Sequence, residues 1–111
     1  MLRASSRAIG QPIDAVDAVE GASTGVPLGP ELVAFVDAVV DRDPERADAA
    51  RRALASAGGR AAVADAAAVL ANFEMMTRVA DGTGARQPPE RLAKLSDERV
   101  RLGLDRYQSA R

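Results

Sequence analysis

The sequence predicts an all-α fold, a small helical bundle, on three observations. Alanine is abundant and aromatic residues make up only 3% of the 111-residue chain, a composition that suits closely packed helices. Apolar residues recur at helical spacing along most of the chain, and no stretch alternates well enough to predict a strand. Proline and glycine fall where helices begin and end.

The first 29 residues are predicted to be an N-terminal arm and loop. "IDAVDAVE", residues 13–20, follows a proline and has the spacing of a two-turn helix, which is too short to be stable alone. "GASTGVPLG" after it is rich in glycine, serine and proline and indicates a loop. Residues 30–111 form the predicted helical domain.

The first long helix is predicted to begin at Pro30. Proline suits the first helical position, and the carboxylate of Glu31 suits the positive end of the helix dipole. Asp37, Asp41 and Arg42 are expected to point away from the core. The predicted apolar face consists of Leu32, Val33, Val36, Val39 and Val40.

A second helix is predicted from Pro44 to Gly58, with Asp43 as its N-cap. Asp48 and Arg52 are spaced to form an ion pair on its exposed side. Its apolar face is thin and consists of Ala47, Ala50, Leu54 and Ala57.

The third predicted helix, Arg60 to Asp81, is apolar on two opposite faces. One face consists of Ala62, Val63, Ala66, Leu70, Phe73 and Ala80, flanked by Val69 and Met76. The other consists of Ala64, Ala68, Ala71, Met75 and Val79. A helix that is apolar nearly all round must be covered on both sides. We therefore expect a homo-oligomer, or pairing with a related helical subunit, with this second face as the candidate interface.

The chain ends in a segment broken by Pro88 and Pro89. Ser96 or Asp97 is expected to cap a last helix. An apolar stripe of Val100, Leu104 and Tyr107 predicts that this tail packs on the rest of the protein.

Composition limits the classes of function. A formal net charge of −1 gives no strong field for nucleic acid or an anionic membrane. The sequence shows no evident apolar run of about 18 residues to span a bilayer and no signal peptide, which predicts a cytoplasmic protein. Without cysteine or histidine the chain has no thiolate nucleophile and lacks the usual neutral-pH base and metal ligand. No catalytic, cofactor-binding or metal-binding residue is predicted, and an enzyme is disfavoured.

Residues 32–84 resemble the C-terminal half of the alkylhydroperoxidase D-like (carboxymuconolactone decarboxylase-like) family. The stretches that carry the resemblance are "LVAFVDAVVDRDPERADAARRALASAGG" and "VADAAAVLANFEMMTRVADGTG". The family has a helix ending near "DP", a second helix ending in a small "AG" turn, and a long helix matched here by Asn72, Phe73, Arg78, Val79, Ala80, Asp81 and Gly84. The resemblance implies an all-α, oligomeric fold.

The same resemblance argues against the family's chemistry in this chain. The family's peroxidase activity uses a Cys-x-x-Cys pair, a histidine a turn beyond and an upstream glutamate, and no residue here matches those positions. The resemblance implies a non-catalytic oligomerisation or interaction domain. The alternative within the family is one half of a split peroxidase-like enzyme, completed by another chain.

Glu74, Arg78 and Asp81 form the best candidate ligand site. Glu74 and Arg78 stand at i,i+4 in the favourable order, and Asp81 follows three residues later. As a site for a small molecule or substrate, Arg78 would hold an anionic group and a carboxylate would act as general base. As a purely structural cluster, the three residues form ion pairs at the end of an apolar helix. Both interpretations stay open on the sequence alone.

Overall fold

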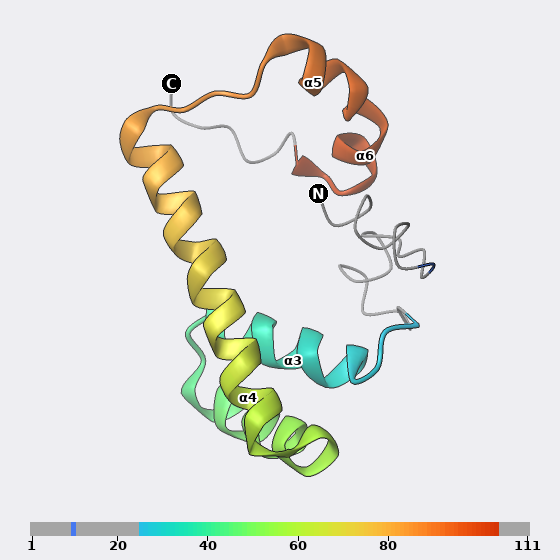
Figure 1. Ribbon diagram of the computed structural model, residues 1–111, viewed down its shortest axis with the longest axis vertical. Helices are drawn as coiled ribbons and strands as arrows, with labels where there is room; N and C mark the ends of the chain where they lie inside the picture. Colours follow the sequence, from blue (N-terminus) through green and yellow to red (C-terminus); the bar gives the residue numbers. More distant parts are fainter. Residues whose placement is uncertain (1–9, 11–24, 105–111) are drawn as a thin grey trace.

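The computed structural model describes residue 10 and residues 25–104, and all regular elements in that part of the chain are helices. These are α3 (Gly29–Val40), α4 (Pro44–Thr83), α5 (Pro89–Lys94) and α6 (Ser96–Arg101) (Figure 1). The all-α prediction is confirmed there. The short helix predicted at residues 13–20 lies outside the described residues.

Helix α3 starts with a proline in its first turn, as predicted, and Leu32, Val33 and Val36 of its predicted apolar face are half-buried. Its most buried side chains are ones that the pattern did not predict. Phe35 and Ala38 are 4% and 1% exposed, whereas Val39 and Val40 are 37% and 53% exposed. Helix α4 covers α3 on the phenylalanine side. The aromatic ring has more apolar surface to bury than a valine, and it sets the rotation of the helix.

A tight turn at residues 41–43 separates α3 from α4. Asp43 caps α4 as predicted, because its Oδ1 accepts hydrogen bonds from the backbone N–H of Glu45 at 3.1 Å and of Arg46 at 3.0 Å. Arg46 also pairs with Asp41 across the turn at 2.9 Å. Arg42, between the two aspartates, takes the left-handed conformation with φ 57°.

Helix α4 is interrupted at Gly59, one residue after the predicted end of the second helix. Gly59 has φ 82° and ψ 169°, a region that is essentially closed to residues with a Cβ. Gly58 is in close contact with the side chain of Leu28, and a Cβ on Gly58 would lie 2.9 Å from the Cβ of Ala62. Two glycines are therefore needed here, one for the turn and one for the close approach.

The interruption divides α4 into a first segment, residues 44–58, and a second segment, residues 60–83. Leu54 of the first segment is completely buried, and together with Phe35 and Ala38 it forms the buried apolar core of the described residues. The second segment turns its predicted face inward. The half-buried residues there are Ala62, Val63, Ala66, Leu70 and Ala80. Phe73, expected on the same face, is 56% exposed.

Helices α5 and α6 pack on each other at the end of the described chain (Figure 1). The sequence did not predict α5, a helix of six residues. The cap predicted for the last helix is wrong, since α6 follows Leu95 and has no side-chain cap hydrogen bond from Ser96 or Asp97. Val100 is 72% exposed, so its predicted packing is wrong too, and Tyr107 lies outside the described residues.

Helix α4 is long and apolar enough, by length and composition, to cross a membrane, which corrects the expectation that no such run exists. The core helix of a soluble protein meets the same criterion, so this property assigns no location. The break at Gly59 leaves the second segment as the longest continuous helix. That segment carries five charged residues, Arg60, Asp65, Glu74, Arg78 and Asp81, and charged groups are costly in hydrocarbon.

Candidate functional site

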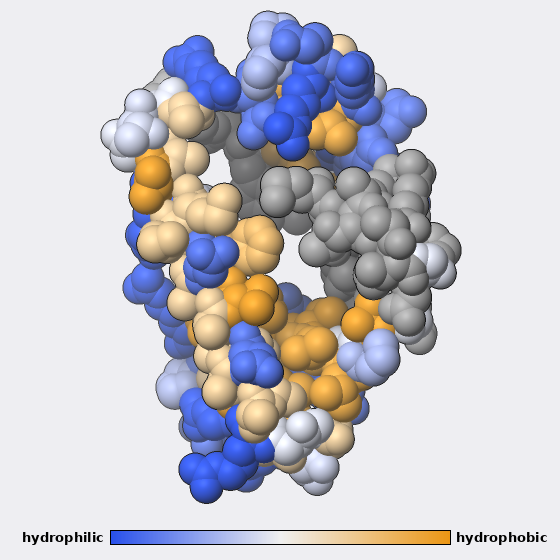
Figure 2. All heavy atoms as spheres, viewed as in Figure 1, coloured by the Kyte–Doolittle hydropathy of each residue, from blue (hydrophilic) through white to orange (hydrophobic). Residues whose placement is uncertain are grey.

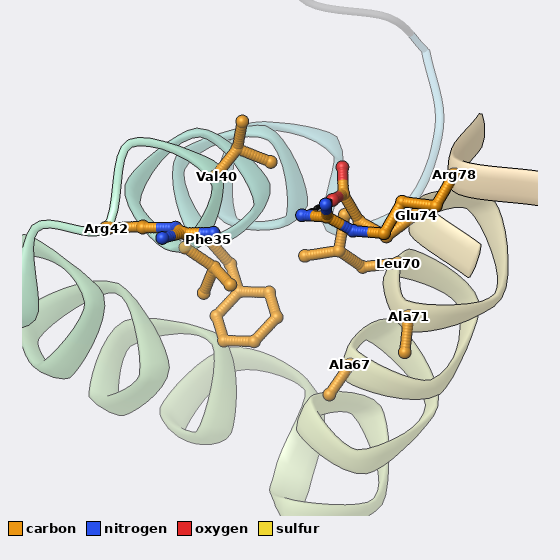
Figure 3. A pocket seen from close by; sticks show the side chains of 9 residues that line it. Phe35, Val40, Arg42, Ala67, Leu70, Ala71, Glu74 and Arg78 are labelled. Atoms are coloured by element: carbon orange, nitrogen blue, oxygen red, sulfur yellow. Dashed lines mark ion pairs between the residues drawn. The ribbon is translucent and has the colours of Figure 1, made fainter. Parts of the chain in front are cut away.

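A pocket of about 340 Å³ lies between the C-terminal end of α3 and the second segment of α4. Figure 3 shows Phe35, Val40 and Arg42 on one side and the side chains of α4 on the other. Chain reversal at residues 41–43 positions the first wall, and the turn at Gly59 positions the second. The lining residues are Phe35, Val39, Val40, Arg42, Ala67, Leu70, Ala71, Glu74 and Arg78.

The structure brings two of the three predicted cluster residues to this pocket. Arg78 Nη2 lies 3.7 Å from Glu74 Oε2, which confirms the i,i+4 ion pair. Both side chains are at least half exposed, so the pair adds about 0.3–0.5 kcal/mol at most to stability. Asp81 lies outside the pocket lining, near the helix end, where its carbonyl oxygen accepts a hydrogen bond from Gly84 N–H at 3.2 Å.

Arg42 is exposed, as the sequence predicted, and it also lines the pocket. Its backbone is left-handed, and it borders the pocket together with Phe35 (Figure 3). Within residues 25–104 its guanidinium has no ion pair or side-chain hydrogen bond. Periodicity could not predict this placement, because Arg42 follows the last residue of α3 and no longer obeys the helical spacing.

The candidate interface on the second segment is exposed along its length. Ala64, Ala68 and Ala71 are exposed, and Met75 and Val79 are 56% and 57% exposed. Ala71 also borders the pocket. The other apolar face is open as well, and its exposed large side chains are Val69, Phe73 and Met76. Figure 2 shows apolar side chains gathered along α3 and α4 rather than enclosed.

A second cavity of about 390 Å³ lies where the two segments of α4 meet, and three arginines border it. Two of them, Arg51 and Arg52, are held by Asp48, which confirms the predicted pair with Arg52 and adds one with Arg51 at 2.9 Å. These side chains are about half exposed or more, so they form a solvated charged edge.

Polar residues elsewhere on the second segment form no metal site. Asp65 and Asn72 are exposed, and Asn72 Nδ2 donates a weak hydrogen bond to Met76 Sδ at 3.7 Å. In residues 25–104 no group of three or more acidic side chains could hold a metal ion.

Comparison with protein-family models, with curated proteins and with solved structures finds no match. The resemblance to the alkylhydroperoxidase D-like family therefore rests on the residue pattern in residues 32–84 alone.

Proposed function

We propose that this protein is a non-catalytic helical module that associates with a second copy of itself through the second segment of α4. The observation that carries this proposal is the exposure of large apolar side chains on both faces of that segment. Each of them is more than half exposed, and they are Val69, Phe73, Met75, Met76 and Val79. Soluble monomers rarely expose apolar patches larger than a few hundred Å².

The small size of the buried core also supports association with a second copy. In the described residues the buried apolar side chains are Phe35, Ala38 and Leu54. Taking a Phe, Met or Val side chain from fully exposed to fully buried contributes about 1.5–3 kcal/mol. These side chains have a little over half of their surface left to bury, so a second copy adds apolar burial that the single chain lacks. Ala64, Ala68 and Ala71 let the backbones of two helices approach closely.

Side-chain size favours an antiparallel pair. The N-terminal half of the candidate interface is small (Ala64 and Ala68), and the C-terminal half is larger (Met75 and Val79). An isologous, two-fold contact needs a surface that complements itself. Antiparallel helices place the small half of one copy against the large half of the other, whereas parallel helices place Met75 against Met75 and leave gaps between the alanines.

Sedimentation velocity at micromolar concentration tests the association. The wild-type chain is expected to sediment as an oligomer, and Ala68→Glu is expected to shift it to monomer because the carboxylate would be buried without a partner. Ala53→Glu, on an exposed position of the first segment, is the matched control and should leave the oligomer intact. A wild-type monomer would overturn the proposal. An oligomer resistant to Ala68→Glu but dissociated by Phe73→Glu would move the interface to the other face.

The family resemblance supports a related proposal, that the partner is another helical subunit and this chain is one half of a split enzyme. In that case a neighbouring reading frame encodes a helix with a Cys-x-x-Cys pair and a histidine. The two purified chains would reduce a peroxide together and not separately. A neighbouring chain that has this helix but is equally active alone would contradict the proposal.

A second function, binding of a small molecule, is favoured by the pocket itself. Its volume of about 340 Å³ and its mostly apolar lining fit a ligand site, with Glu74 and Arg78 at the rim as polar groups. Arg78→Ala should weaken ligand binding, because it removes a lining side chain and its pair with Glu74, and it should leave the circular dichroism spectrum unchanged. Loss of stability with unchanged binding would show that the ion pair is structural.

A further inference from the structure

We propose that the pocket between α3 and α4 binds an apolar monocarboxylate and that Arg42 holds its carboxylate. This inference rests on the ligand-binding function proposed above. It adds the chemical class of the ligand and the residue that recognises its charged end.

The walls of the pocket select an apolar body. Six of the nine lining residues are apolar, namely Phe35, Val39, Val40, Ala67, Leu70 and Ala71. Phe35 is 4% exposed and its ring closes one wall (Figure 3). A cavity of about 340 Å³ accepts a medium-length alkyl or a single-ring aryl chain.

The charges of the pocket select a single anionic group. Two guanidinium groups and one carboxylate line it, and the carboxylate of Glu74 already pairs with Arg78 at 3.7 Å. This leaves Arg42 as the surplus positive charge, without a side-chain partner in residues 25–104. The planar guanidinium matches a carboxylate with two parallel hydrogen bonds, and one such ligand makes the pocket neutral.

The backbone at Arg42 adds a second, independent observation. A φ of 57° is the left-handed conformation, which costs an L-residue with a long side chain about 1–2 kcal/mol. A turn alone is formed more easily by glycine or asparagine. Residues held in such conformations cluster at ligand sites, and here Arg42 lines the pocket together with Phe35 (Figure 3).

Titration of the protein with octanoate and with uncharged octanamide, followed by amide chemical shifts, tests this assignment. Octanoate should shift the resonances of the pocket residues and bind more tightly than octanamide. Arg42→Gln should weaken octanoate binding by about tenfold or more, the loss expected for a hydrogen bond to a charged group. Octanamide binding should be unchanged. Arg86→Gln removes the same charge outside the pocket and should leave both affinities unchanged.

Three results would overturn the inference, and they are distinguishable. Equal binding of both probes, insensitive to Arg42→Gln, would keep the ligand site but remove the role of Arg42. Sensitivity to Arg78→Gln alone would make Arg78 the anchor. Shifts confined to Phe73, Met75 and their neighbours, or no saturable shift at all, would remove the ligand-binding function itself. Circular dichroism of each variant shows whether it is folded.

Discussion

Gly59 is the residue on which the path of the chain depends most. With φ 82° and ψ 169° it ends one helical segment and starts the next in a different direction. Gly59→Ala should lower the free energy of unfolding by about 1–3 kcal/mol, because a Cβ is strained in that region. Urea denaturation followed by circular dichroism measures this change in the free energy of unfolding. Gly82→Ala, in open space within the helix, should instead raise the free energy of unfolding by up to about 1 kcal/mol. Equal effects of the two substitutions would contradict the special role of the backbone at Gly59.

Asp43 is the second residue whose role can be measured directly. It accepts two backbone hydrogen bonds at the start of α4, so Asp43→Ala should cost about 1 kcal/mol of stability. Asp43→Asn keeps an accepting oxygen and should cost less. A loss that is the same for alanine and asparagine would show that the carboxylate charge, rather than the cap, stabilises the helix.

Residues with purely local roles were predictable from the sequence. The Asp43 cap, the break after Gly58 and the Glu74–Arg78 pair each depend on neighbours within four residues. Arg42 was not predictable, because its left-handed backbone occurs at an amino acid with no preference for it. Its place in the pocket also depends on α4 returning to α3, which is a tertiary contact.

Among the elements, the second segment of α4 shows what the spacing of apolar residues can predict and what it cannot. The half-buried face was predicted except for Phe73, yet the pattern could not say whether one chain or two would cover both faces. The apolar face of α3 was predicted only in part: Leu32, Val33 and Val36 are half-buried, but the buried Phe35 and Ala38 were missed because several valines outweighed one phenylalanine in the pattern. The six residues of α5 were missed because a double proline suggested a break, and short helices carry little periodic information.

The proposed antiparallel pairing of two second segments can be tested by crosslinking. The chain has no native cysteine. A variant with both Ala68→Cys and Met75→Cys should form a covalent dimer on mild oxidation, because antiparallel helices bring position 68 of one copy near position 75 of the other. Met75→Cys alone should form little. Efficient crosslinking of that single variant would indicate a parallel pair, as read on a non-reducing gel.

At the scale of the whole molecule, folding and assembly should be linked. The buried apolar core of the described residues is small, so part of the stability is expected to come from contacts between copies. A protein whose folded state associates has a Tm that rises with its concentration. We therefore expect Tm to increase over a roughly hundredfold range of protein concentration and the dependence to disappear in Ala68→Glu. A constant Tm for the wild-type chain would show that the single chain is stable by itself.

The exposed connection between α4 and α5 is a site for limited proteolysis. Helix α4 closes with hydrogen bonds from Gly84 and Ala85 N–H to carbonyls of its last turn, and residues 85–88 then run exposed and without helix to α5. A protease needs such an extended stretch to bind its substrate as a strand. Trypsin should therefore cut early after Arg86 and release a fragment that contains α3 and α4. The same connection is a suitable place to shorten the chain or to insert a label, because the pocket and the candidate interface would be kept.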